Sequence, residues 1–524
     1  MKKAAISLAK ISYVIAGLIV LFLTIESART TFVINVGDLS DSAVREVKDN
    51  ILVNILFAVI GIVIFYGFSR LLFKGSDREK HAKRLFIISA CISAAVFGVL
   101  VFFVAKTFIP PYWDQMQVYL DAKNFNAGDY SDMEYVYLKM YPQQYGLIFF
   151  EGLLLRICSH YGFLQCLNAL FVALSIFLSG RLTYEITEDA CISFFAVLLT
   201  AADIPLMYYV SFVYGDVFMV FALITTSLLI TKWIKTGKWG YLAGSYILMC
   251  ISLPVRQNTL LYLIALMIFL AVMSIREKKL LYLIAAPFFL ILPLLANAGT
   301  QVYYEKKSGI EISRDEIPHI NWVVMGLQGE VDEGLGVGYY NGYNYASWNL
   351  NGSTKKNAIE FSKGVLSERL DEFKNDPKMT VRFFRYKALE QWNEPLFESA
   401  HMTVAPEGYE QEYADNPVYS LFYSSKVLSV IRYAMNRYMF FVYLFVFIYI
   451  CRLIVKDEDP HSLLLTVAFT GGFLFSLIWE AKGRYVFPFF AVLLPVAAIG
   501  VKTSLDLCVS KAERIFKKKG NTPQ

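Results

Sequence analysis

The chain has 524 residues, of which 56% are hydrophobic and 16% aromatic, and its formal net charge is +5. Only 18% of the residues are charged, against roughly 25% in a typical soluble domain, so the composition excludes an ordinary soluble globular protein. The small basic excess gathers in short loops, which is a membrane-topology pattern and does not indicate a nucleic-acid partner. No Cys-x-x-Cys pair occurs among the seven cysteines, so we expect neither disulfides nor a cysteine metal site.

Apolar segments of membrane-crossing length recur along the whole chain. A bilayer core needs roughly 20 apolar residues in a helix, and shorter segments can reach that length by extending into flanking aromatic residues. The sequence therefore predicts an all-α polytopic membrane protein with about 12 transmembrane helices. The expected spans are 11–25, 51–73, 85–108, 164–182, 190–203, 214–231, 241–255, 259–275, 281–299, 437–455, 462–479 and 487–503. The first lacks a convincing cleavage site and is expected to be retained.

Basic residues in the short loops predict the orientation. They gather in four places, at 74–84, 232–238, 276–279 and 517–519. The positive-inside rule puts these loops and both termini on the cytoplasmic side of the cell membrane. This holds only if the apolar stretch 145–157, which contains Glu151 and Arg156, is an amphipathic helix on the outer surface. If the stretch instead crosses the bilayer, the side of every later loop is reversed.

We expect three parts in the chain. Residues 1–299 form an N-terminal transmembrane core, with a large outer loop at 109–142 and the surface helix 145–157. Residues 300–436 are too long for a connector and predict a small extracytoplasmic α or α/β domain. Residues 437–524 supply the last transmembrane helices and a basic cytoplasmic tail.

The outer loop 109–142 carries the strongest functional signal. It is polar, aromatic and acidic, and it lies between apolar runs. Asp114 follows Pro110-Pro111-Tyr112-Trp113 directly after the third span, so two prolines stiffen the backbone that holds this carboxylate near the bilayer surface. An ionisable group beside membrane segments is costly and is more often functional. Asp114 is the main catalytic candidate, and its neighbours Trp113 and Gln115 are candidates for substrate contact.

Other carboxylates differ in their surroundings. Asp216 opens the sixth span after Tyr214-Gly215 and is the second catalytic candidate, because it too adjoins aromatic and apolar residues. Asp121 is a weaker candidate for substrate binding, and Asp203, at the end of the fifth span, is weaker than Asp216. We expect the remaining acids of the outer loop to be solvated; these are Asp129, Asp132 and Glu134.

Cations are expected on the same face as these acids. Arg256 lies between two apolar runs, and Lys482 and Arg484 lie between the last two spans. Arginine binds phosphate oxygens bidentately and keeps its charge in a poor dielectric, so these residues are candidates for an anionic group. The alternative is a structural ion pair of Glu480 with Arg484 at i,i+4 spacing.

Few residues suggest metal chemistry. His319, in Pro318-His319-Ile320-Asn321-Trp322, is a lone histidine that either binds substrate or makes a structural hydrogen bond. No second histidine or tight acidic cluster lies near it in the sequence, so no metal site and no cofactor are predicted. Glu480 and Tyr485 join His319 as candidates for substrate binding.

The order of these segments resembles the GT-C superfamily of polytopic glycosyltransferases, which use polyprenyl-phosphate sugars. It is most similar to enzymes of the protein O-mannosyltransferase and aminoarabinose transferase type, in the Gram-positive branch that decorates wall polysaccharides or teichoic acids. The segments that carry the resemblance are Pro110 to Gln115, Tyr141-Pro142, Asp216, Pro318 to Trp322, Met325-Gly326-Leu327, Gln391 to Pro395 and Glu480 to Tyr485.

The resemblance implies roles for individual residues. Asp114 matches the loop aspartate that acts as general base, and Asp216 matches the second acid. Arg484, with Arg256 and Lys482, would hold the lipid phosphate. The chain departs from the family where Gln115 replaces the second acid of the usual loop pair, and where extra spans precede the loop.

The sequence and the resemblance together predict a membrane glycosyltransferase. It would move a monosaccharide from a polyprenyl-phosphate donor to a hydroxyl of a cell-surface glycan or similar acceptor, on the outer face of the membrane and by inversion. A transporter or flippase of lipid-linked saccharides is one alternative, and it would place charges inside the spans. A polymerase or ligase that uses a lipid-diphosphate donor is another.

Overall fold

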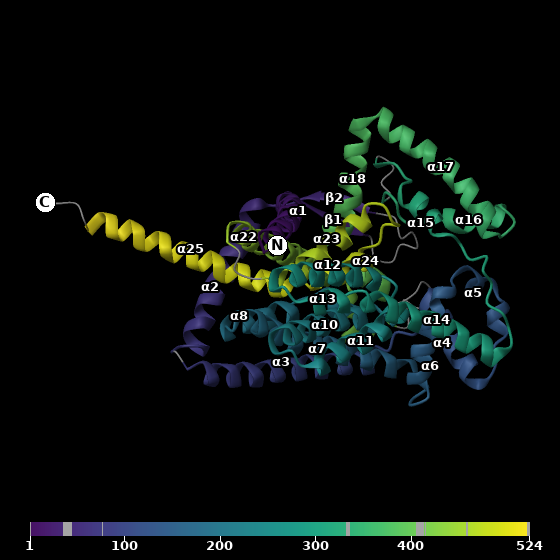
Figure 1. Ribbon diagram of the computed structural model, residues 1–524, viewed down its shortest axis with the longest axis horizontal. Helices are drawn as coiled ribbons and strands as arrows, with labels where there is room; N and C mark the ends of the chain where they lie inside the picture. Colours follow the sequence, from purple (N-terminus) through teal and green to yellow (C-terminus); the bar gives the residue numbers. More distant parts are fainter. Residues whose placement is uncertain are drawn as a thin grey trace.

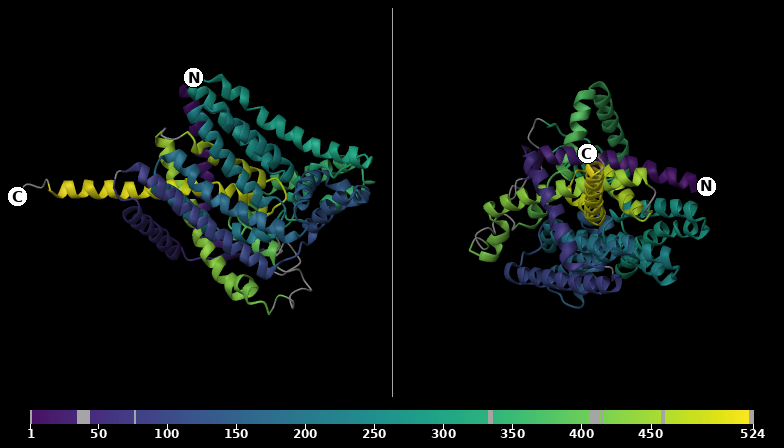
Figure 2. Two further views of the ribbon diagram at one scale, coloured as in Figure 1. Left: turned by 90° about the horizontal axis from the view of Figure 1, so that it is seen from below. Right: turned by 90° about the vertical axis from the view of Figure 1, so that its left-hand side faces the viewer.

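The computed structural model describes residues 2–34, 44–75, 77–331, 336–404, 413, 415–456 and 460–520. Helices that run side by side dominate it (Figure 1). Figure 1 and the left view of Figure 2 also show that the end of the last helix stands clear of the body. Within the described residues, 8 helices are long and apolar enough to cross a membrane, or up to 10 if each of two bent helix pairs is one span. The all-α, multi-pass fold expected from the sequence is confirmed.

The predicted spans coincide with observed helices. Ten lie on the long helices and bent pairs, and two lie on the shorter apolar helices α11 and α23. The long helices are α1 (Lys2–Arg29), α2 (Ile51–Leu72), α3 (Arg78–Thr107), α7 (Tyr161–Thr187), α10 (Asp216–Thr236), α12 (Thr259–Glu277), α13 with α14 (Leu280–Ala285, Phe288–Ser308) and α22 (Ser425–Val455); α11 is Trp239–Val255 and α23 is Ser462–Ser476.

The two bent pairs have the same cause. In the first, α8 (Ala190–Ala201) meets α9 (Ile204–Tyr208) and the short 3₁₀ helix η3 (Tyr209–Ser211) at 53°; in the second, α24 (Gly483–Ala491) meets α25 (Leu494–Gly520) at 50°. Pro205 and Pro495 lie just after the bends. Each lacks the N–H that would bind the carbonyl four residues earlier, at the last residue of the preceding helix, so the helix breaks there.

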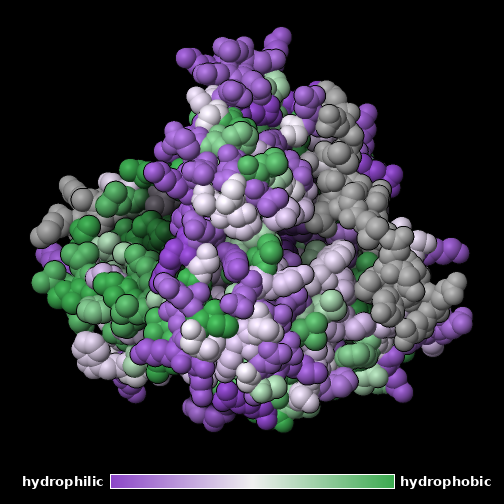
Figure 3. Space-filling model, turned by 90° about the vertical axis from the view of Figure 1, so that its right-hand side faces the viewer, coloured by the Kyte–Doolittle hydropathy of each residue, from purple (hydrophilic) through white to green (hydrophobic). Residues whose placement is uncertain are grey.

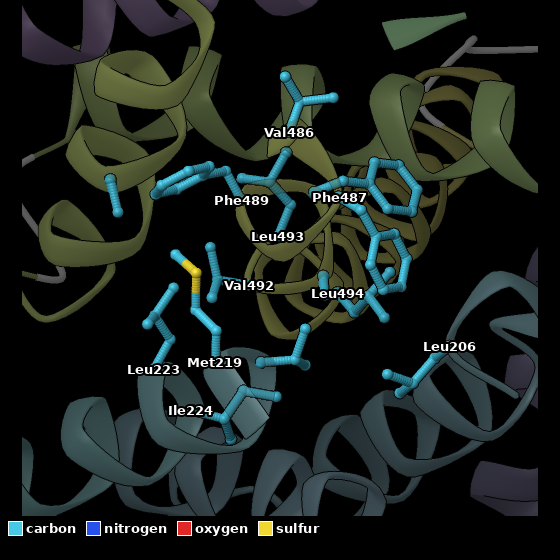
Figure 4. Packing of buried hydrophobic residues seen from close by; sticks show 14 of the residues in the cluster. Leu206, Met219, Leu223, Ile224, Val486, Phe487, Phe489, Val492, Leu493 and Leu494 are labelled. Carbon is cyan, nitrogen blue, oxygen red and sulfur yellow. The ribbon is translucent and has the colours of Figure 1, made fainter. Parts of the chain in front are cut away.

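Close packing holds the helices together. Figure 4 shows residues of α24 and the turn after it, such as Phe489 and Leu493, lying against Met219 and Leu223 of α10. At Gly500 a Cβ atom would lie 1.9 Å from the backbone oxygen of Phe445, so only glycine allows α25 and α22 to approach this closely. Within a bilayer, such packing contacts contribute more to helix association than burial from water does, because the lipid tails are as apolar as the helix surfaces.

The predicted outer loop 109–142 is mostly helical. It contains α4 (Trp113–Ala127), the 3₁₀ turn η1 (Ser131–Glu134) and α5 (Val136–Met140), and the turn η2 (Pro142–Gln144) leads into α6 (Tyr145–Leu155). Helix α6 has 11 residues and packs on α4, α11 and α14. Its rise of about 16 Å is near half the thickness of a bilayer core, which favours the interpretation that it does not cross.

The helices on either side continue into the region 300–436. Helix α14 continues to Ser308, and α22 begins at Ser425. The described residues between them form α15 (His319–Gly326), α16 (Tyr343–Leu350), α17 (Lys355–Asn375), α18 (Pro377–Trp392), α19 (Ser399–Thr403) and α21 (Pro417–Tyr423). Positions 332–335, 405–412 and 414 of this region lie outside the described residues. Helices α17 and α18 project from the bundle, where the surface is hydrophilic (Figures 1 and 3).

A small hairpin was not predicted. Strand β1 (Thr30–Ile34) pairs antiparallel with β2 (Val44–Lys48), with Thr30 opposite Lys48. The amide of Phe32 donates to the carbonyl of Asn393 at 3.0 Å. The hairpin therefore ties the end of α1 to the end of α18.

Candidate functional site

The candidate site lies where four connections between helices meet. They are 108–114 at the start of α4, 212–216 at the start of α10, 255–258 between α11 and α12, and 479–485 at the start of α24. Tyr214 links them, because its hydroxyl lies 3.4 Å from Asp114 Oδ2 and its ring lies 5.4 Å from the Arg256 guanidinium and 5.3 Å from that of Arg484. Segments far apart in sequence thus bring the predicted acid and the predicted cations to one place.

Asp114 is held in the first turn of α4 with its side chain exposed. The preceding residue, Trp113, has φ +52, a left-handed conformation that is rare for a bulky side chain and costs about 1–3 kcal/mol. Its ring lies 6.0 Å from that of His401. The strained backbone at Trp113 sets the direction in which Asp114 enters the helix, and the helix N-terminus favours the negative charge.

A short polar network surrounds the Asp114 carboxylate. Gln144 Nε2 donates to the Tyr214 hydroxyl at 2.5 Å, and the Tyr137 hydroxyl lies 3.4 Å from the same oxygen. Burial raises the pKa of both tyrosines above its ordinary value, and the charge of Asp114 raises it further. Both tyrosines therefore stay neutral and can donate a hydrogen bond to the carboxylate or to a substrate oxygen.

Asp216 and Arg256 form a buried ion pair. Asp216 Oδ1 lies 2.7 Å from Arg256 Nη2, and the two side chains are 1% and 9% exposed. The two charges are in contact, but the N–H of Arg256 Nη2 is not aligned for a hydrogen bond to Asp216 Oδ1. Gly215, with φ +85, permits it: a Cβ there would lie 2.7 Å from the Val255 carbonyl oxygen. Asp216 therefore has a charged partner, whereas Asp114 is exposed.

Arg484 occupies an aromatic cage. Its guanidinium lies 5.5 Å from the ring of Phe212 and 5.3 Å from those of Tyr214 and Tyr485. The residue is 8% exposed, and its Nε is buried without a hydrogen-bond partner. A guanidinium desolvated in this way has donors left for an anion.

The alternative pairing of Glu480 with Arg484 at helical spacing does not fit the structure. Residues 480–482 are not helical, because α24 begins only at Gly483. Glu480 Oε2 instead accepts a hydrogen bond from the Tyr485 hydroxyl at 3.0 Å. Burial raises the pKa of Glu480, and the nearby charges of Lys482 and Arg484 oppose this shift.

Three predicted contact residues lie in other settings. Gln115 is buried and accepts hydrogen bonds from the Tyr161 hydroxyl at 2.6 Å and the Val213 amide at 3.3 Å, so it joins α4 to the 212–216 connection. Asp121 is buried, accepts from Gln117 at 2.7 Å, and has its pKa raised to about 7 mainly by desolvation. His319 is exposed and lies beside two tryptophans, and partial desolvation of its ring lowers its pKa.

The sequence did not single out Tyr137, Gln144, Phe212 or Tyr214. Tyr214 directly precedes Gly215-Asp216 and Gln144 lies two residues after Pro142, so both are close to segments that the sequence marked. Tyrosines are too frequent in this chain for one of them to be distinctive. Among the residues that the structure describes, no group of three His, Cys, Asp or Glu side chains could hold a metal ion.

A cavity of about 780 Å³ lies at the other end of the bundle. It is lined by the end of α2, the start of α3 and parts of α7, α8 and α25, including Arg70, Lys74, Arg78 and Lys502. None of the predicted site residues lines it.

Comparison with protein-family models gives no match for this chain, and comparison with curated proteins gives none either. The chain is a multi-pass helical membrane protein.

Proposed function

We propose that the chain is a glycosyltransferase that takes a monosaccharide from a polyprenyl-phosphate donor and transfers it, with inversion, to an acceptor hydroxyl. The observation that carries the proposal is that Tyr214 contacts both groups. Its hydroxyl meets the exposed carboxylate of Asp114, and its ring meets the caged guanidinium of Arg484. One group can take a proton and the other can hold a leaving phosphate.

The chemistry needs only these groups and the two substrates. Asp114 accepts the proton of the acceptor hydroxyl, and the freed oxygen attacks the anomeric carbon of the donor. The bond from that carbon to the phosphate oxygen breaks, and the lipid monophosphate leaves with the electron pair. Arg484 stabilises the charge that develops on the phosphate, in surroundings where water is largely excluded. The ion pair of Arg256 with Asp216 holds the connection that carries Tyr214.

The reaction would take place at the surface of the bilayer. The donor's lipid tail would lie in the bilayer between helices, and the acceptor would be a cell-wall glycan or similar polymer. The side chains of the site would face the outside of the cytoplasmic membrane, with both termini inside, as the basic loops indicate. The resemblance to GT-C enzymes supports the donor class.

Sugar transfer by purified protein tests the proposal. Wild type in detergent is supplied with a panel of polyprenyl-phosphate monosaccharides, beside Asp114→Asn and the matched control Glu134→Gln, which alters an exposed acid of the same loop. We expect Asp114→Asn to lose about 10²–10⁴ of the rate, the usual contribution of a general base, and the control to keep it. Transfer at the wild-type rate in Asp114→Asn would contradict the proposal.

One observation favours a transporter as the second candidate. Asp203 lies at the break between α8 and α9, is fully buried, and has no hydrogen-bond partner for either side-chain oxygen. Broken helices with buried polar groups are typical of ion-coupled transporters. Flux of labelled lipid-linked saccharide across vesicles that is lost in Asp203→Asn, together with no transfer from any monophosphate donor, would favour this candidate.

A further inference from the structure

Aromatic rings continue outward from the acid of the candidate site. From Tyr214, beside Asp114, the Tyr137 hydroxyl lies 3.4 Å away, and the ring of Tyr137 lies 5.2 Å from that of Tyr141. The ring of Tyr141 in turn lies 6.0 Å from that of Trp322. Rings from the 212–216 connection, α5 and α15 thus form one continuous series.

The series ends in a pair of parallel tryptophans. The rings of Trp322 and Trp479 lie 6.0 Å apart with an interplanar angle of 3°, and the ring of Phe475 stacks on Trp479 at 5.1 Å. His319 meets both tryptophans edge-on, at 6.3 Å and 5.8 Å. Two parallel rings, one from α15 and one from the connection before α24, thus meet at the end of the series.

The surrounding structure fixes these rings in place. Trp322 and Tyr141 pack against a small buried cluster of Ile317, Trp348 and Ala358. The carbonyl of Trp479 accepts a hydrogen bond at 2.8 Å from the Nζ of Lys387, which is fully buried in α18. Rigid rings bind with little loss of conformational freedom, which is the property that a preformed site needs.

Partial exposure distinguishes this series from an ordinary core. Tyr141, Trp322 and Trp479 are neither buried nor fully exposed, and His319 is exposed. On this side of the molecule the middle of the surface is mostly hydrophilic or of intermediate hydropathy, and apolar surface lies to the left (Figure 3). A groove for a lipid tail would be lined by aliphatic side chains, whereas here each ring offers an apolar face and most carry a polar edge.

A sugar ring matches these properties. A pyranose has C–H groups on its faces and hydroxyls around its rim, so its faces pack on flat aromatic rings while the rim reaches tyrosine hydroxyls, indole N–H groups and imidazole. We propose that the series Tyr137, Tyr141, His319, Trp322 and Trp479 binds a chain of pyranose residues, the part of the acceptor glycan next to the attacking hydroxyl. The identification of this glycan as the acceptor rests on the proposed glycosyl transfer, while the binding of the glycan can be measured separately.

Binding is tested without catalysis. Wild type, Trp322→Ala and Trp322→Phe are purified in detergent and titrated with malto-, cello-, manno- and chitohexaose by calorimetry. Trp239→Ala is the matched control, because Trp239 is exposed at the start of α11 and takes no part in the series. We expect saturable binding of at least one hexasaccharide, weakened about tenfold in Trp322→Ala, which corresponds to about 1.4 kcal/mol. Trp322→Phe, which keeps an aromatic face, should bind between the two.

Two results would overturn the inference. One is the absence of saturable binding of all four hexasaccharides to wild type, and the other is equal binding by wild type and a folded Trp322→Ala. If Trp322→Ala does not fold, equal binding by wild type and Tyr141→Ala would overturn it instead. Binding that depends on Trp322 in a protein that transfers no sugar would end the glycosyltransferase proposal and support the glycan site. In a transferring protein we expect the KM for the acceptor to rise about tenfold in Trp322→Ala, with the KM for the donor unchanged.

Discussion

The two ends of the helix bundle hold the same kinds of charged residue in opposite surroundings. At the turn between α2 and α3, Arg78 lies 3.7 Å from Glu188, and these side chains are 82% and 64% exposed. At the candidate site, Arg256 lies 2.7 Å from Asp216, and these side chains are 9% and 1% exposed. One pair is solvated, while the other is enclosed among aromatic rings.

The contrast separates solvated charges from charges that are enclosed by the protein. An exposed pair contributes about 0–1 kcal/mol and is screened by salt. A buried charge is expensive and persists only where a partner compensates it. Arg256 has that partner in Asp216, while Arg484 has aromatic faces and a buried Nε without a hydrogen-bond partner. The difference indicates which cation is available for a ligand.

Breaking the buried pair should have the largest effect on stability. Arg256→Met leaves Asp216 charged and buried without its partner, so we expect the free energy of unfolding to fall by about 3–5 kcal/mol. The double variant Arg256→Met/Asp216→Leu removes both charges and should recover most of the loss. Thermal denaturation in detergent measures both. Single-variant losses that simply add in the double variant would show that the two charges do not compensate each other.

Removing the caged cation should reduce activity more than stability. Arg484→Met deletes the donors proposed to hold the leaving phosphate, and we expect the transfer rate to fall about 10²–10³-fold, the cost of losing one such group. Arg484→Lys keeps the charge but loses the planar fork, so it should recover only part of the rate. Steady-state transfer from the polyprenyl-phosphate donor measures the change. An unchanged rate in Arg484→Met would remove this residue from the site.

A buried lysine should make stability depend on pH. Desolvation lowers the pKa of Lys387 to about 7 in the folded protein, from 10.5 for the free side chain. The unfolded chain therefore binds a proton between these pH values that the folded chain does not, so stability rises with pH across this window. The slope should approach about 1.4 kcal/mol per pH unit.

Two variants isolate that slope. Lys387→Met removes the titrating group and should flatten the pH dependence of denaturation between pH 7 and 10. The control Lys374→Met alters an exposed lysine at the end of α17 and should leave the slope as in wild type. Equal slopes in wild type and Lys387→Met would mean that Lys387 keeps its proton when buried, with Glu390 and Glu480 compensating it.

The exposed pair should show the smallest effect. Arg78→Gln removes the contact with Glu188 at the turn between α2 and α3. We expect a change of less than about 1 kcal/mol in the free energy of unfolding, and a still smaller change in high salt. A loss as large as that of Arg256→Met would cancel the contrast between the two ends.

The sequence determined the spans because their signal is local. A run of apolar residues long enough for a bilayer identifies a helix without knowledge of its neighbours, and each predicted span coincides with an observed apolar helix. The same hydropathy pattern did not reveal that α4 occupies the predicted loop, because the buried face of this helix mixes apolar Val118, Ala122 and Phe125 with polar Gln115 and Asp121. The hydropathy pattern also did not locate the boundary between α17 and α18 at Asp376. The side chain of Asp376 caps α18 by accepting a hydrogen bond from the Met379 amide at 3.0 Å.

The sequence marked Asp114, Asp216, Arg256 and Arg484 individually, from the cost of charge beside membrane segments. The sequence did not show that Asp216 pairs with Arg256, that Tyr214 and Tyr485 surround Arg484, or that Asp114 is exposed; these follow from the folded arrangement. Most of these contacts join residues far apart in the chain, and they depend on which helix ends meet. In lipid that choice is made by shape and close packing rather than by a polar pattern, so the order of residues alone does not show it.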